Sequence, residues 1–169
     1  ALDRPRIMAI VNVTPDSFSD GGERLDPAQA IDDGLRFVSE GADIVDVGGE
    51  STRPGSRPID ADEELQRVLP VVAGLAKHNV VVSIDTRRAA VAKACLDAGA
   101  RIVNDVSALQ DDPDLLALVA ARGAPVVLMH RAGRAEEKYA VPAYGNVVEE
   151  VRRFLLARAE ACQAAGIAR

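Results

Sequence analysis

The chain has 169 residues, of which 48% are apolar, which is enough for one packed core and too little for two ordinary domains. Its formal net charge of −6, without any run of lysine or arginine, excludes a general nucleic-acid surface and a polybasic membrane patch, although a local cationic site for an anionic substrate remains possible. Because the sequence has neither a membrane-length apolar run nor closely spaced cysteines, we expect a cytoplasmic protein with a single domain over residues 1–169.

Short β-branched runs alternate along the chain with longer stretches in which apolar residues recur every three or four positions. We predict strands at residues 7–13, 42–48, 80–86, 101–106 and 124–130. We predict helices at roughly residues 27–40, 61–78, 88–98, 113–121 and 145–165. Aspartate followed by proline marks the start of two of these helices, at Asp26 and Asp112, and glycine follows several helix ends.

The strands indicate a parallel α/β sheet, since near-continuous apolar runs such as "KHNVVVSI" and "GAPVVLM" are typical of strands buried on both faces. A doubly wound sheet would normally carry a Gly-rich phosphate turn after its first strand, and "NVTPDSFSDGG" has neither usual form of that turn. Polar residues instead stand at the C-terminal ends of all the predicted strands: Asn12, Asp46, Glu50, Asp85, Asn104, Asp105 and His130. This convergence favours a (β/α)8 TIM barrel, of which the chain supplies the first five β/α units.

Four segments carry a more specific signal: "IMAIVNVTPDSFSDGG", "GADIVDVGGESTRPGS", "VVVSIDTRRAAVAKACLDAGARIVNDVSAL" and "VVLMH". In this order they resemble the N-terminal part of the dihydropteroate synthases, which are barrel enzymes of folate biosynthesis. The resemblance implies a transferase that condenses 6-hydroxymethyl-7,8-dihydropterin diphosphate with 4-aminobenzoate and releases pyrophosphate, with Mg²⁺ as the cofactor. Because a C–O bond to a diphosphate breaks, such a reaction needs neutralisation of the leaving group more than a strong base.

The resemblance implies that Asn12 holds the metal ion and the diphosphate, and that Thr52 and Arg53 bind the diphosphate oxygens. Chemically, Arg53 offers a planar fork of donors that matches a phosphate. The alternatives without a function in catalysis are that Asn12 only stabilises the turn before Thr-Pro and that Arg53 is a solvated loop residue. On the resemblance, Asn12, Arg53 and Asp85 are the expected catalytic residues.

The loop segments also imply an aminobenzoate site. Phe18 lies among small and polar residues, where an apolar ring is suited to wall the flat substrate together with Pro54. Ser56 follows Pro54 in the segment "STRPGS" and is also expected to bind the substrate. The alternative for Phe18 is an anchor that pins its loop to the barrel rim.

The pterin ring needs hydrogen-bond partners in its own plane, and Asp85 and Asn104 supply an acceptor and an amide that both donates and accepts. They match the pterin-contacting residues of the family, and Met129 is expected to pack on the ring. Asp46 is left as a structural residue or as a supporting residue of the site. His130 is expected to be structural.

The later segments of the family do not occur in this sequence, so we expect the chain to be part of a longer protein. A homodimer of that complete protein stays open. Two other functions stay open. One is a pterin-dependent methyltransferase, and the other is a non-catalytic pterin-binding half-barrel or partner module. The diphosphate and aminobenzoate loops favour the synthase over both.

Overall fold

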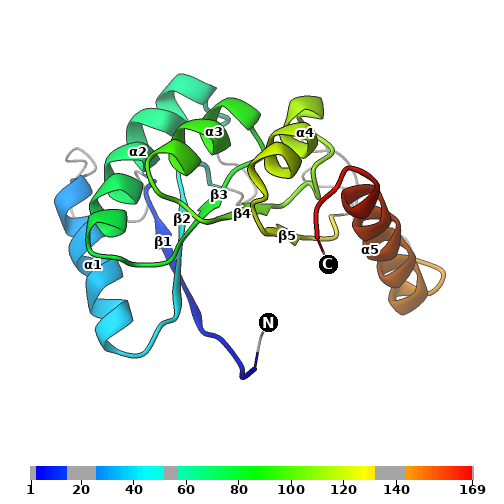
Figure 1. The fold of residues 1–169 in the computed structure, drawn as a ribbon, viewed down its shortest axis with the longest axis horizontal. Helices are drawn as coiled ribbons and strands as arrows, with labels where there is room; N and C mark the ends of the chain where they lie inside the picture. The colour runs from blue at the N-terminus through cyan, green and yellow to red at the C-terminus, as the bar shows by residue number, and fades with distance from the viewer. Residues whose placement is uncertain (1–2, 15–25, 52–56, 132–143, 169) are drawn as a thin grey trace.

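The computed structural model describes residues 3–14, 26–51, 57–131 and 144–168, and these form alternating strands and helices (Figure 1). The strands are β1 (Met8–Asn12), β2 (Ile44–Gly48), β3 (Val82–Asp85), β4 (Ile102–Asp105) and β5 (Val126–Leu128). The helices are α1 (Pro27–Ser39), α2 (Ala61–Lys77), α3 (Ala89–Asp97), α4 (Pro113–Arg122) and α5 (Val147–Ala164). Every predicted strand and helix is confirmed.

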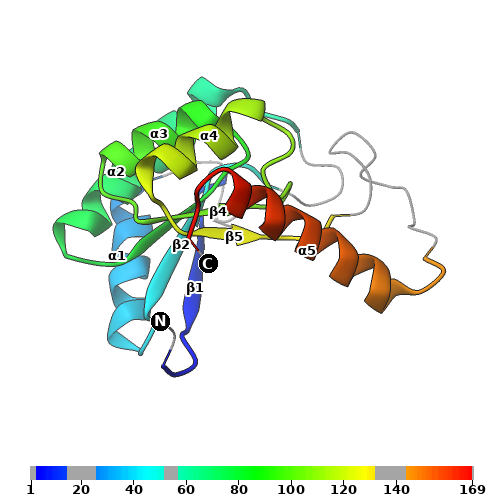
Figure 2. The ribbon, with the colours of Figure 1, turned by 45° about the vertical axis from the view of Figure 1, so that its right-hand side comes forward.

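The strands form one parallel sheet in the order β1-β2-β3-β4-β5. Helices α1 to α4 lie together on one side of this sheet, as both ribbon views show (Figures 1 and 2). A doubly wound sheet reverses its strand order at a switch point and carries helices on both faces. The sequential order and the one-sided helices are those of consecutive units in a (β/α)8 barrel, which confirms the predicted fold class.

The core lies between the sheet and the helices. Alternate strand residues such as Val45, Val47 and Ile84 are fully buried there and join one apolar cluster with helix residues such as Val68 and Leu75. Since successive strand side chains point to opposite faces, the residues between them lie on the concave face, away from the helices. On that face Ile10 is 63% exposed and Val127 is 39% exposed, so part of it is accessible to a ligand.

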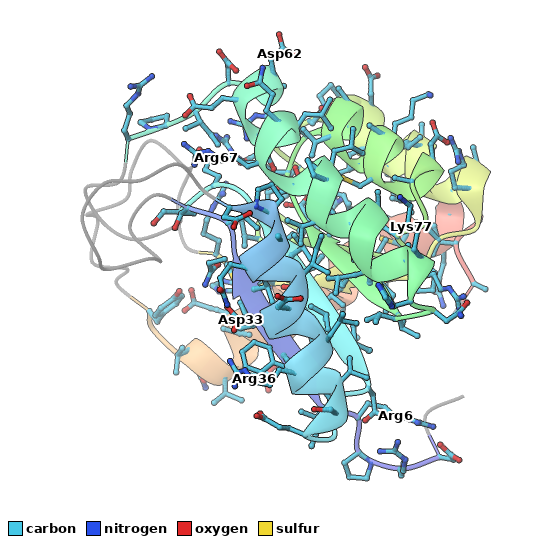
Figure 3. All side chains as sticks on the ribbon, turned by 90° about the vertical axis from the view of Figure 1, so that its left-hand side faces the viewer. Arg6, Asp33, Arg36, Asp62, Arg67 and Lys77 are labelled. Atoms are coloured by element: carbon cyan, nitrogen blue, oxygen red, sulfur yellow. The ribbon has the colours of Figure 1, made fainter. Side chains whose placement is uncertain are left out.

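Helices α1 and α2 approach each other closely because each places a glycine beneath an aliphatic side chain of the other. A Cβ atom on Gly34 of α1 would lie 2.8 Å from Leu75 of α2, and a Cβ atom on Gly74 would lie 2.3 Å from Ile31. Figure 3 looks onto these two helices, with charged residues such as Arg36 on their outer surface. This packing fixes the helical layer behind β1, β2 and β3.

Aspartate side chains cap the start of three of the helices. Asp26, Asp60 and Asp112 accept hydrogen bonds from backbone N–H groups in the first turns of α1, α2 and α4, as the two Asp-Pro pairs led us to expect. None of the helices in the described ranges is both long enough and apolar enough to cross a membrane.

Candidate functional site

The strand register brings together residues at or next to the ends of the first four strands. Asn12 pairs with Gly48, Gly48 with Asp85, and Asp85 with Asn104. These four residues, which we call the site row, therefore lie side by side at the C-terminal edge of the sheet, on the concave face. A Cβ atom on Gly48 would lie 3.6 Å from both Asn12 Oδ1 and Asp85 Oδ2, so the missing side chain leaves these two groups facing a shared space.

Asp85 has an unusual protonation equilibrium. Burial and the nearby carboxylates of Asp46, Asp105, Glu64 and Glu50 raise the pKa of Asp85 to about 7. Near neutral pH its carboxyl group therefore exists in both forms, as a hydrogen-bond acceptor when ionised and also as a donor when protonated. A ligand that offers a donor or a positive charge would favour the ionised form.

Asn104 is held by Asp46, the residue whose role the sequence left open. The side-chain amide of Asn104 donates to Asp46 Oδ2 at 2.9 Å, although the two residues lie on strands separated by β3. Asp46 is only 4% exposed, and burial raises its pKa, against the opposing effect of Ser83 and Asn104. In the described part of the chain, Asp46 Oδ1 and Ser83 Oγ are buried without a hydrogen-bond partner of ordinary geometry.

Asp105 does not join the site row. It pairs in register with Leu128, lies on the opposite face from its neighbour Asn104, and is fully buried. Its carboxylate accepts 2.7 Å hydrogen bonds from the backbone N–H groups of Ser107 and Leu109 and from the Ser107 hydroxyl. Asp105 thus shapes the loop after β4, in which Leu109 adopts a positive φ of 62°.

A chain of ion pairs links the loops that follow β2, β3, β4 and β5. Its members, in order of contact, are Glu64, Arg88, Glu50, Arg87, Asp111 and Arg131. We call this set the rim network. The sequence offered only the paired arginines of "TRR" as a sign of it, because the partners come from separate loops.

Glu50 is the centre of the rim network. Arg88 approaches it at 2.8 Å and Arg87 at 3.3 Å. Burial raises the pKa of Glu50, but hydrogen bonds from the two guanidinium groups outweigh this effect and lower it overall. Glu50 is therefore held ionised at the start of the loop that leads into residues 52–56.

The end of β5 divides into an exposed residue and a packed one. Met129 is 41% exposed and lies two residues after Val127, which pairs with Asn104 on the concave face. The His130 ring instead packs edge-on against Phe154 of α5, with a centroid distance of 5.0 Å. This contact supports the structural role expected for His130 and leaves Met129 available at the site.

The predicted loop residues Phe18, Thr52, Arg53, Pro54 and Ser56 lie outside the described residues. Their roles at the diphosphate and the aminobenzoate stay predictions. Asn12, by contrast, is exposed at the end of β1 and belongs to the site row.

The described residues contain no group of three His, Cys, Asp or Glu side chains placed to hold a metal ion. The donor set at the site row nevertheless fits Mg²⁺, because this ion is commonly held by one or two protein oxygens with water and substrate phosphates completing its shell. The amide oxygen of Asn12, which is exposed at the end of β1, is the donor that the row offers to such an ion.

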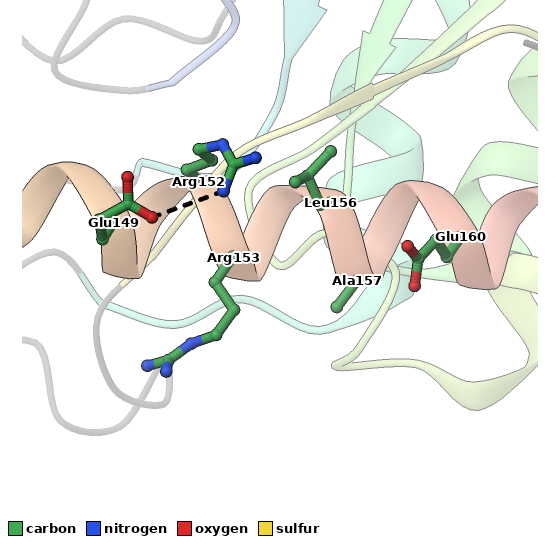
Figure 4. A pocket seen from close by; sticks show the side chains of 6 residues that line it. All are labelled: Glu149, Arg152, Arg153, Leu156, Ala157 and Glu160. Atoms are coloured by element: carbon green, nitrogen blue, oxygen red, sulfur yellow. Dashed lines mark hydrogen bonds and ion pairs between the residues drawn. The ribbon is translucent and has the colours of Figure 1, made fainter.

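A separate hollow of about 360 Å³ lies along α5 and is drawn in Figure 4. Its lining residues all belong to that helix: Glu149, Arg152, Arg153, Leu156, Ala157 and Glu160. Because none of these residues belongs to the site row, the hollow is distinct from the candidate site at the strand ends.

Comparison with known proteins agrees with this location. A family model described as "Pterin binding enzyme" matches residues 8–169. The dihydropteroate synthase of Mycobacterium leprae is 53% identical to 96% of this chain, which covers 57% of that protein. The chain therefore spans less than two thirds of the length of this relative.

Solved structures agree in fold. A Xanthomonas albilineans dihydropteroate synthase determined with 4-aminobenzoic acid is 49% identical, with a TM-score of 0.89 over 99% of this chain and 59% of its own. The same enzyme in complex with 7,8-dihydropteroate gives 45% identity and a TM-score of 0.85, covering 99% of this chain and 58% of that one. With a family model that extends over nearly all of its residues and the site row in place, the chain belongs to the family of pterin binding enzymes.

Proposed function

We propose that the protein is a dihydropteroate synthase, which joins 6-hydroxymethyl-7,8-dihydropterin diphosphate to 4-aminobenzoate and releases pyrophosphate. The observation that carries this proposal is the site row, in which an amide, a carboxyl group and a second amide line one edge of the sheet. The relatives named above support the same reaction, because one was determined with 4-aminobenzoic acid and with 7,8-dihydropteroate.

In this proposal, Asp85 and Asn104 bind the pterin ring. Ionised Asp85 accepts hydrogen bonds from the amino and N–H groups of the ring, and the amide of Asn104 both donates and accepts. As the bond to the diphosphate breaks, positive charge spreads from the methylene carbon into the ring. The carboxylate of Asp85 would then stabilise that positive charge. The positive charge would in turn favour the ionised form of Asp85, which the raised pKa otherwise disfavours.

The diphosphate would lie at Asn12, with Thr52 and Arg53 as further anion contacts. When bound there, Mg²⁺ would neutralise negative charge on the leaving group. Phe18, Pro54 and Ser56 would surround the aminobenzoate, whose amine attacks the methylene carbon. A cytoplasmic location and a homodimer of the complete protein remain predictions from the sequence.

Calorimetric titration of the full-length protein with the pterin diphosphate, with and without Mg²⁺, tests the proposal. We expect binding that Mg²⁺ strengthens, followed by pyrophosphate release when 4-aminobenzoate is added. Asp85→Asn should weaken binding by about 100-fold, since a charge-assisted bond at a buried site contributes about 1.5–3 kcal/mol. Asp32→Asn, an equivalent change at an exposed position on α1, is the control.

Two outcomes would contradict the synthase. Tight binding without pyrophosphate release would indicate a non-catalytic pterin-binding protein. Absence of any pterin binding, while the protein remains folded, would reject the site row as a pterin site.

A further inference from the structure

We propose that Asp46 is a positioning residue, which fixes the orientation of the Asn104 amide and thereby sets the hydrogen-bond pattern that the site row offers to its ligand. That the ligand is a pterin rests on the proposed function. The orientation of Asn104 does not, because it follows from contacts within the described chain.

The geometry places Asp46 one layer below the site row. It precedes Gly48 by two residues on β2 and so points to the same face, where it pairs in register with Ser83 of β3. Asn104 reaches it from β4, across β3, to form the 2.9 Å hydrogen bond. The small side chain of Ser83 leaves room for this contact between strands that are not neighbours.

The chemistry of the pair determines which way the amide points. An ionised carboxylate only accepts hydrogen bonds, so the NH₂ group of Asn104 must face Asp46 and its carbonyl oxygen must face away. One N–H and the oxygen of Asn104 remain for a ligand, in a fixed arrangement beside Asp85. An amide at position 46 would both donate and accept, and Asn104 would then lose this preference.

The burial of Asp46 indicates a role other than stability. One of its carboxylate oxygens has no hydrogen-bond partner of ordinary geometry among the described residues, and a buried polar atom without such a partner destabilises the folded state. Its raised pKa is a second sign that the ionised form is disfavoured where it stands. Removing the charge should therefore not harm the fold, whereas the orientation of Asn104 depends on it.

The test uses four variants of the full-length protein: Asp46→Asn, Asn104→Ala, the double mutant that combines these two changes, and Asp32→Asn. Asp32→Asn is the matched control, since it makes the same change at an exposed position on α1. The probe is 6-hydroxymethylpterin, which isolates ring recognition from the diphosphate. Affinity, melting temperature and the NMR signals of the Asn104 side-chain NH₂ are measured.

We expect Asp46→Asn to weaken pterin binding about tenfold, without lowering the melting temperature, and to shift the Asn104 NH₂ signals in the ligand-free protein. In the Asn104→Ala background, the same change should alter affinity by less than about twofold, because the residue through which Asp46 acts is gone. Asp32→Asn should leave both affinity and the Asn104 signals unchanged.

Equal losses of affinity in both backgrounds, or a fall in melting temperature that parallels the loss, would overturn the proposal. Unchanged Asn104 signals in Asp46→Asn would also overturn it. If the unsubstituted protein does not bind the pterin, the proposed function fails, but the NMR signals still decide whether Asp46 orients Asn104.

Discussion

Gly48 and Gly49 are adjacent in the chain but face different surroundings. A Cβ atom on Gly49 would lie 2.7 Å from Val68 Cγ1 and 3.2 Å from the Glu64 carbonyl oxygen. We therefore expect Gly49→Ala to lower the free energy of unfolding by about 1–3 kcal/mol, as overpacking in a core does. Gly48→Ala meets only ordinary contacts and should fold normally, while its methyl group enters the space between Asn12 and Asp85.

Urea denaturation and calorimetry separate these two effects. Gly48→Ala should weaken binding of the pterin diphosphate about tenfold at nearly unchanged stability. Full affinity in this variant would show that the space between the two side chains is not used by the ligand.

At this scale the sequence predicted part of the site well. Asn12, Asp85 and Asn104 could be chosen because each stands at or next to the end of an apolar strand, and parallel strands bring such ends together. The contact between Asp46 and Asn104 could not be predicted in this way, because it joins strands that do not pair. The opposite orientation of Asp105 follows from strand alternation, which a list of strand-end residues ignores.

At the scale of elements, the rim network gives the two arginines after β3 different roles. Arg88 pairs with the fully buried Glu64 and also donates to the Ile59 carbonyl, whereas Arg87 contacts only half-buried partners among the residues described. Burial already raises the pKa of Glu64, with Thr86 and Arg88 opposing the rise. Without Arg88 this carboxylate would be left unpaired in the core.

We expect Arg88→Ala to destabilise the protein by about 3 kcal/mol or more, the usual cost of breaking a buried ion pair from one side. Arg87→Ala should cost about 1 kcal/mol or less, because partly exposed pairs contribute little. Chemical denaturation of both variants measures the difference. A second change, Glu64→Gln, should recover part of the stability of Arg88→Ala, and no recovery would mean that the loss has another origin.

The ends of the elements show where local sequence ceases to be informative. The two Asp-Pro caps were predictable because cap and helix are contiguous in the chain. The start of α3 was predicted to within one residue, but its cap was not, since Arg88 provides no side-chain cap and the Ala89 N–H donates instead to Asp112, at 2.7 Å, from the loop before α4. β5 is also shorter than its apolar run, because pairing with β4 extends only over Val126–Leu128.

For the whole molecule, the two ends of the barrel wall carry carboxyl groups with opposite pKa shifts. At the N-terminal end, hydrogen bonds from Arg4 and from the Ile7 N–H lower the pKa of Asp43 to about 2. At the C-terminal end, burial and neighbouring carboxylates raise the pKa of Asp85 to about 7. The N-terminal end thus holds a carboxylate whose ionisation stabilises the fold, and the C-terminal end holds one whose ionisation destabilises it.

These shifts predict how stability depends on pH. The stability that Asp43 contributes is present above its ordinary pKa of about 4 and is lost as the pH falls toward 2. Asp85 acts in the opposite sense, because its protonated form is favoured in the folded state. Its contribution is complete below pH 4 and is lost as the pH rises through 7.

Melting temperatures from pH 2 to pH 8 test both windows. Asp85→Asn should flatten the decline between pH 4 and pH 7 and melt about 2–6 °C above the unsubstituted protein at pH 8, although it binds the pterin diphosphate more weakly. Asp43→Asn should remove the loss between pH 4 and pH 2 and leave the upper window unchanged, which makes each variant the control for the other. If Asp85→Asn melted lower than the unsubstituted protein at pH 8, the carboxylate would be stabilised by its surroundings, and the electrostatic basis of the site would have to be rejected.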